Sequence, residues 1–253
     1  ASNTAMENAK VKGVIGCGAG FNPGSAGGQV RFDFFGIAGT GDFNMQELLA
    51  LEDPLSRAGN RHCIRTFPGP HEWPPVPVME EAFQWLMLNA MRDGRIPIES
   101  AMVSGIMDGF RKNIDSLRAK NQLIAAGDAC REAVRFAEGL GPAGGFRDME
   151  DAIVKMPEYA RQITYREALL RKEAEEQSLL QNSLLSTDPG WWKNRIAAME
   201  SRNMKGKNPE DTLMYSRLRA FLSLFCYAAV NQLMSQHEMA GAEKAVVIYA
   251  MAD

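Results

Sequence analysis

An aspartate and a histidine, two residue types well suited to moving protons, each follow a short apolar run in this sequence. Asp42 comes after the run at 32–38, and His71 comes after the run at 62–67. A carboxylate that accepts the Nδ1 proton of a histidine fixes the tautomer of the ring, so that Nε2 can take a proton from a nucleophile. The two residues therefore predict a general base, His71, oriented by Asp42.

The segments around these residues predict a βαβ unit. The runs at 32–38 and 62–67 are typical of strands, and the leucines and alanines of 45–58 between them are typical of a helix. Strands joined in this way run parallel, and functional groups collect just beyond their carboxyl ends. We therefore expect Asp42 and His71 on neighbouring loops at one edge of a sheet, within hydrogen-bond reach.

Both residues also have an ordinary structural interpretation. Asp42 ends a GTGD sequence, which fits a simple turn because glycine and aspartate both favour turn conformations. His71 follows a proline and could equally bond to the backbone as a loop histidine. Their order and their places on the predicted elements favour the chemical interpretation over the structural one.

The order of these residues leads to a family resemblance. An aspartate and then a histidine, separated by one βαβ unit, are the last two triad members in the α/β-hydrolase fold, where the nucleophile comes first. The strand followed by GTGD, the GPHEWPP loop and the helix containing EEAFQWL resemble the carboxyl-terminal half of an α/β-hydrolase of the carboxylesterase and dienelactone-hydrolase type. The resemblance covers residues 1–92, about a third of the chain.

The resemblance implies a serine esterase-like hydrolase that acts on esters, thioesters or related small acyl compounds. Asp42 would orient His71, which would act first as general base and then as general acid. Glu72 and Trp73, next to the histidine, would shape the pocket. The resemblance implies no metal and no organic cofactor.

The nucleophile of such a system is missing from the sequence. Neither G-x-S-x-G nor its cysteine form occurs, although in the resembled family the elbow helix leads into the strand expected here at 11–17. The chain is therefore predicted to hold only the last three strands of a hydrolase sheet. Because the strand at 11–17 would then be an open edge, we expect it to be paired or covered, by the missing half, by a second copy or by the chain's own helices.

Two features near that strand indicate other chemistry, and each has a plainer explanation. The GCGAG sequence at 16–20 is similar to a dinucleotide-binding motif, but Phe21 replaces the third glycine and Pro23 forbids the helix that must follow. Cys17 could replace the missing nucleophile. It lacks a strand-to-helix elbow, so a packed cysteine is expected instead.

Composition excludes several classes of protein. A net charge of −3, with lysine and arginine dispersed along the chain, argues against nucleic-acid binding. No apolar run reaches the roughly 18 residues that a membrane span requires. The four cysteines are far apart and form no C-x-x-C pair, which argues against a zinc site or a disulfide framework and favours a reducing, cytoplasmic compartment.

The sequence from 78 onward predicts where the first domain ends. The segment 78–92 is typical of an amphipathic helix whose apolar residues share one face, namely Ala82, Phe83, Leu86 and Met87. Gly94 and Pro97 mark its end. With 253 residues, the chain is long enough for two domains, and we expect a partial α/β-hydrolase domain at 1–97.

The remaining residues, 98–253, predict a helical domain, so the expected fold class is α/β followed by all-α. The pair 222–234 and 240–252 resembles a tetratricopeptide-type hairpin, although an irregular bundle fits nearly as well. The predicted helices lie at 99–124, 127–139, 147–155, 158–185, 189–201, 209–236 and 240–252.

A second function of a different class is open. The chain could be a non-catalytic interaction or scaffold protein that works through its helical domain, because Asp42 and His71 alone have no nucleophile to activate. The reading frame upstream of Ala1 distinguishes the two. A nucleophile motif there favours the enzyme, and a native start codon there favours the scaffold.

Overall fold

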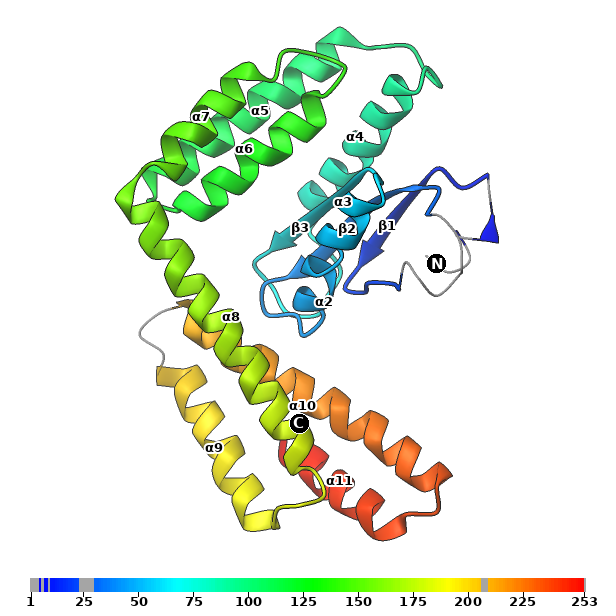
Figure 1. The fold of residues 1–253 in the computed structure, drawn as a ribbon, viewed down its shortest axis with the longest axis vertical. Coiled ribbons are helices and arrows are strands. Elements are labelled where there is room, and N and C mark those ends of the chain that lie inside the picture. Colours follow the sequence, from blue (N-terminus) through cyan, green and yellow to red (C-terminus); the bar gives the residue numbers. More distant parts are fainter. Residues whose placement is uncertain (1–4, 6, 9, 23–29, 206–208, 253) are drawn as a thin grey trace.

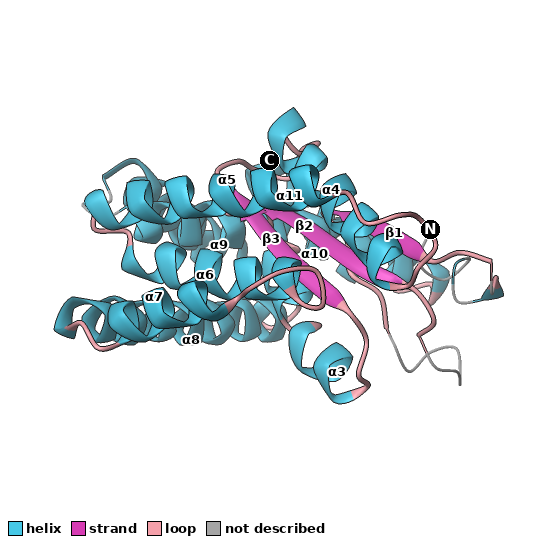
Figure 2. Cartoon of the chain, turned by 90° about the horizontal axis from the view of Figure 1, so that it is seen from above, coloured by secondary structure: helices cyan, strands magenta, loops and turns pink. Residues whose placement is uncertain are grey.

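The computed structural model describes residues 5, 7–8, 10–22, 30–205 and 209–252. The described chain is mostly helical, with a small parallel sheet in its amino-terminal part (Figure 1). The sheet has the strand order β1-β2-β3, seen side by side in Figure 2. Its strands are β1 (Gly13–Cys17), β2 (Asp33–Gly39) and β3 (His62–Phe67).

The parallel βαβ unit expected around β2 and β3 is confirmed, but its connection is two short helices instead of one. These are α2 (Met45–Leu49) and α3 (Glu52–Arg57). Pro54 explains the break at Ala50, since proline has no backbone N–H and its ring would clash with the carbonyl of Ala50, four residues earlier, in a continuous helix.

The two faces of the sheet are covered by different helices. Successive residues of a strand point to opposite faces, so Phe34 packs with Leu48 and Leu55 of α2 and α3. Phe35 packs on the other face, where its ring meets the Trp85 ring edge-on with centroids 5.6 Å apart. Trp85 belongs to α4 (Val76–Arg92).

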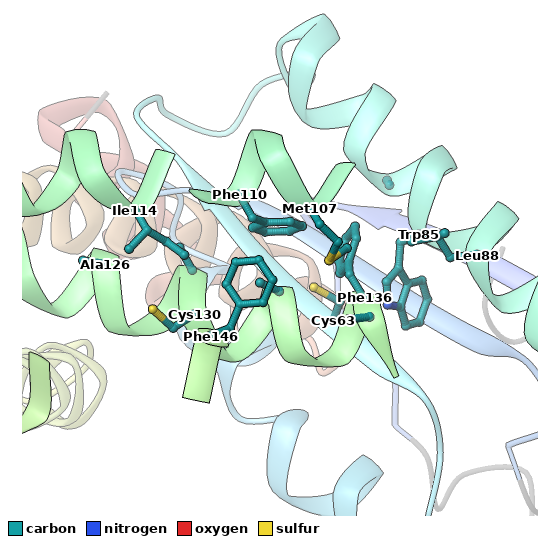
Figure 3. Close-up of a cluster of buried hydrophobic side chains, with 14 of the residues drawn as sticks. Cys63, Trp85, Leu88, Met107, Phe110, Ile114, Ala126, Cys130, Phe136 and Phe146 are labelled. Atoms are coloured by element: carbon teal, nitrogen blue, oxygen red, sulfur yellow. The ribbon is translucent and has the colours of Figure 1, made fainter. Parts of the chain in front are cut away.

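The core between the sheet and α4 is continuous with the core formed by the next three helices. Cys63 of β3 and Trp85 are buried in one cluster with Phe110, Phe136 and Phe146 (Figure 3). The helices that supply these phenylalanines are α5 (Ser100–Ala119), α6 (Leu123–Ala137) and α7 (Gly144–Val154). The domain boundary predicted after residue 97 thus lies between α4 and α5, two helices that share this first core.

The last four helices build a second core. Leu180, Trp192, Leu222 and Ile248, one from each of these helices, are all buried in it. The helices are α8 (Pro157–Ser183), α9 (Pro189–Lys205), α10 (Pro209–Ser235) and α11 (Met239–Ala252). The helical segments predicted from 98 onward are all present. The first was predicted too long, because Asn121 has a positive φ of 56° and separates α5 from α6.

The helix α10 is unusually apolar. Within the described residues, Glu210–Ser235 is long and apolar enough, by length and composition alone, to cross a membrane, although no such segment was expected from the sequence. Leu218, Leu222 and Cys226 of this helix are buried in the second core. Packing inside the bundle therefore accounts for part of its apolar composition.

Candidate functional site

Asp42 and His71 lie on the loops that follow β2 and β3, at the same edge of the sheet. The loops are held together by backbone hydrogen bonds, because Thr40 N donates to the carbonyl of Phe67 and Gly41 N donates to the carbonyl of Gly69, each at 2.8 Å. Nδ1 of His71 lies 3.1 Å from Oδ2 of Asp42. The contact that the sequence predicted is therefore present in the structure.

Contacts other than the one with His71 also hold the Asp42 side chain in place. Asp42 is 1% exposed, and its Oδ1 accepts a hydrogen bond of 2.8 Å from the backbone N–H of Asn44. This is the Asx-type turn that aspartate commonly forms with the residue two positions on. The side-chain amide of Asn44 (Nδ2) in turn donates to the carbonyl of Gly18. Both carboxylate oxygens are thus engaged, and the side chain has one orientation.

Gly18, directly after β1, completes the site. Its φ is +60°, and a Cβ added to it would lie 2.7 Å from Cε1 of His71 and 3.1 Å from Oδ2 of Asp42. Glycine is therefore required here for two independent reasons, the left-handed backbone and the lack of space. Sequence reasoning treated 16–20 only as a failed dinucleotide motif, and residues 23–29, on which part of that argument rested, lie outside the described residues.

The histidine is open to solvent on the side away from Asp42. Its side chain is 51% exposed, and its ring stacks on Phe43 with the centroids 4.9 Å apart and the planes 28° apart. Within the described part of the chain, no hydrogen bond is made by Nε2. The free Nε2 is the atom that must accept a proton in a base of this kind.

Cys17, the candidate replacement for the missing nucleophile, is partly buried against the first core. Its Sγ lies 4.0 Å from Sδ of Met79, and the side chain packs against the first core. Burial raises the pKa of the Cys17 thiol, which disfavours the reactive thiolate. The expectation of a packed cysteine is therefore consistent with its surroundings. The described residues contain no cluster of His, Cys, Asp or Glu that could hold a metal ion.

Glu72 and Trp73, which the resemblance placed at a pocket, are not among the residues that line the cavity next to the site. Both are exposed, and Trp73 is 83% exposed because the loop directs it into solvent. A cavity of about 460 Å³ has Phe43 in its lining. Apart from Phe43 it is lined by α10 and α11, through Ser216, Arg219, Ala220, Ser223, Leu224, Tyr227, Tyr249 and Ala252.

A buried ion pair connects the helical bundle to the loop that carries Asp42. Arg217 of α10 donates from Nε to Oε1 of Glu173 of α8 at 2.8 Å, and from Nη1 to the carbonyl of Thr40 at 2.6 Å. The two charged side chains are only 7% and 0% exposed. Sequence reasoning missed this contact because its partners are far apart in the chain and neither Arg217 nor Glu173 stands in a motif.

The carboxyl ends of all three strands thus bring one polar pair together, with a packed glycine beneath it and a cavity beside it. The positions of Asp42 and His71 follow from the strand ends, whereas Gly18, Phe43 and Arg217 become visible only in the folded chain. Comparisons of this chain with protein-family models, curated proteins and solved structures found no match.

Proposed function

We propose that Asp42 and His71 are the acid–base part of a catalytic triad for the hydrolysis of esters or thioesters, with a nucleophile that these 253 residues do not supply. The observation that carries this proposal is the bond between Nδ1 of a half-exposed histidine and a buried carboxylate, which leaves Nε2 free. The buried carboxylate is itself held by a backbone N–H, so it can fix the tautomer and the orientation of the imidazole.

The arrangement suits two proton transfers in succession. Nε2 of His71 would take the proton from an attacking hydroxyl or thiol and later give it to the leaving group. Asp42 would stabilise the imidazolium that forms between these steps, without taking up the proton itself. The Phe43 ring, stacked on the imidazole, would limit the directions from which a substrate can approach.

The strand order supports a partial α/β-hydrolase fold for residues 1–97. The aspartate follows the middle strand and the histidine follows the next strand in a parallel sheet. This is the chain order of the last two members of an α/β-hydrolase triad. In that fold the nucleophile comes from a strand that precedes β1 in the chain.

The test is esterase activity with and without the residues encoded upstream of Ala1. We expect the 253-residue chain alone to leave p-nitrophenyl butyrate at the buffer rate of hydrolysis. The extended protein should hydrolyse the ester and carry G-x-S-x-G or G-x-C-x-G upstream. His71→Ala should abolish turnover and Asp42→Asn should lower it by about 10⁴-fold.

A histidine far from the site supplies the control for this experiment. His237→Asn, in the turn between α10 and α11, should leave the rate of the extended protein unchanged. Equal rates for the His71→Ala and His237→Asn proteins would contradict the proposal. Turnover by the 253-residue chain alone that disappears in His71→Ala would place the nucleophile within it, at Cys17 or at a residue outside the described ones such as Ser25.

A non-catalytic scaffold is the second candidate, and the helical part provides the observation in its favour. Large apolar side chains are exposed on α10 and α11, as expected for a surface that binds another protein. They are Leu224, Tyr227, Val246 and Val247. The weak likeness of these helices to tetratricopeptide hairpins agrees with such a role. A start codon directly before Ala1, with no further coding sequence, would favour this second function.

A further inference from the structure

The cavity beside His71 is built almost entirely by the carboxyl-terminal helices. On α10 it is lined by Ser216, Ala220, Ser223 and Tyr227, whose spacings of three or four residues place them on one stripe of a helix. α11 contributes Tyr249 and Ala252 on the opposite side. The volume of about 460 Å³ is within the range of pockets that hold small ligands.

Phe43 is the wall that the cavity shares with the polar pair. The Phe43 ring lines the cavity and also stacks on the His71 imidazole, at a centroid distance of 4.9 Å. The position of α10 against this loop is fixed by Arg217, which is next to Ser216 in the chain and donates to the carbonyl of Thr40. This hydrogen bond therefore holds the cavity in a fixed position relative to His71.

The chemistry of the lining favours an uncharged, mainly apolar ligand. Leu224, Tyr227 and Tyr249 supply apolar and aromatic surface, and the serine and tyrosine hydroxyls can donate hydrogen bonds to a carbonyl oxygen. The positive charge of Arg219 already has protein partners, because Nε donates to the carbonyl of Ala252 at 2.6 Å and Nη1 lies 3.4 Å from Glu200. An anionic ligand would have to compete with the Glu200 carboxylate.

We propose that this cavity binds the aliphatic acyl chain of a neutral ester, with the ester group directed past Phe43 toward Nε2 of His71. The inference rests on the proposed hydrolytic function and adds the substrate class and the part of the chain that selects it. The helical domain is then the specificity element of the site, and the loops after β2 and β3 supply the proton chemistry.

Binding can be measured in the 253-residue chain without turnover. Saturation-transfer NMR with methyl hexanoate as the probe should show transfer to the acyl protons, and a titration should give a Kd. Leu224→Gln places an amide on the apolar wall and should raise that Kd about tenfold. Ala220→Trp fills the cavity and should abolish the transfer, while circular dichroism and the melting temperature report whether the bundle still folds.

Leu179→Gln is the matched control, because Leu179 is 42% exposed on α8 and Leu224 is 46% exposed on α10. Only Leu224 lines the cavity, so Leu179→Gln should keep the Kd of the unmodified chain. No saturation transfer, or an equal Kd for the two glutamine variants, would overturn the proposal, and so would tighter binding of the hexanoate anion than of its methyl ester.

These outcomes are separate from those that test hydrolysis. If methyl hexanoate binds as expected and His71→Ala leaves the esterase rate of the extended protein unchanged, the proposed function fails and a binding cavity remains. If turnover depends on His71 and methyl hexanoate does not bind here, the function stands and the acyl chain lies elsewhere.

Discussion

At the scale of single residues, the site depends on the lack of a side chain at Gly18 as well as on the side chains of Asp42 and His71. Asp42 is held by Asn44, and His71 rests between Asp42, Phe43 and the backbone of Gly18. An additional methyl group at Gly18 would push against the imidazole itself. A substitution at Gly18 is therefore expected to displace the His71 ring while both polar side chains of the site are unchanged.

Gly18→Ala tests this expectation, and the chain offers a matched control. Gly59 has nearly the same backbone conformation, with φ +69°, but nothing lies within 4 Å of a Cβ placed there. Both alanine variants should lose about 1 kcal/mol of stability from the left-handed backbone. We expect Gly18→Ala to cost more in urea unfolding, and it alone should shift the His71 ring nitrogen resonances. Equal stabilities and an unchanged His71 spectrum would mean that the loop can relax.

A buried glutamate on α6 gives the fold a pH dependence of its own. Glu132 is 6% exposed, and burial raises its pKa to about 8, although Arg65 of β3, 3.3 Å away, acts in the opposite direction. Between about pH 4.5 and pH 8 the folded protein therefore binds a proton that the unfolded chain has released. Stability should be full below this window and should fall as the pH rises through it.

Glu132→Gln tests this linkage. The glutamine cannot ionise, so the variant should gain stability relative to the unmodified protein as the pH rises from 5 to 8, by about 3 to 5 kcal/mol if the whole shift applies. Urea unfolding at several pH values measures the difference. Parallel stability curves for the two proteins would show that Glu132 does not titrate in this range.

At the scale of elements, Arg217 connects the helical bundle to the loop that carries Asp42. Arg217 and Glu173 form a buried pair, and removing one partner of such a pair leaves the other charge uncompensated, at a cost of about 3 to 5 kcal/mol. Arg217→Met alone should therefore be strongly destabilising. The double variant Arg217→Met with Glu173→Leu should recover most of that loss.

Amide exchange separates the stability effect from the positioning effect. The double variant lacks the hydrogen bond to the Thr40 carbonyl even where the bundle is stable. Exchange at Thr40 and Gly41 should therefore be faster in the double variant than in the unmodified chain, while exchange in the second core stays slow. Unchanged protection of the loop would show that the backbone bonds from β3 hold it without Arg217.

Strands and helices followed from the sequence, but the faces and ends of helices did so less well. For α4, Ala82, Phe83, Leu86 and Met87 were expected on one face. Phe83 and Met87 are in fact 57% and 41% exposed, while Trp85, Leu88 and Met91 are buried. The helix is apolar on several sides, so periodicity alone does not choose a face, and packing against β2 makes that choice.

At the scale of the whole molecule, the contacts that sequence patterns could not supply are those between distant segments. Phe43 meets α10 and α11 across the cavity, and Thr40 meets Arg217. Arg217 and the cavity residues of α10 and α11 stand in no motif, so nothing in the sequence places them beside the GTGD loop. The Asp42–His71 contact could be predicted from the sequence because both residues follow the ends of neighbouring strands, and the βαβ pattern places these ends side by side.

The outer edge of β1 bears on how the chain associates. Among the described residues β1 pairs only with β2, and the Lys12 carbonyl and the Gly18 N–H both bond toward it. Since backbone groups alternate along a strand, those of Gly13, Ile15 and Cys17 point away from β2. Side chains of the chain's own helices lie over one face, where Leu86 contacts Gly13, but they do not pair this edge.

We expect this edge to pair with another strand, from a second copy or from residues encoded upstream, because an unpaired apolar edge is a template for strand addition. Sedimentation and light scattering should then show association of the 253-residue chain at micromolar concentration. Ile15→Pro removes an outward N–H without breaking the bonds to β2 and should shift the chain toward monomer, whereas Ile15→Ala, which keeps the N–H, should not. A monodisperse unmodified monomer, with fast amide exchange at Gly13, Ile15 and Cys17, would show that the edge stays open to water and that no second strand is needed.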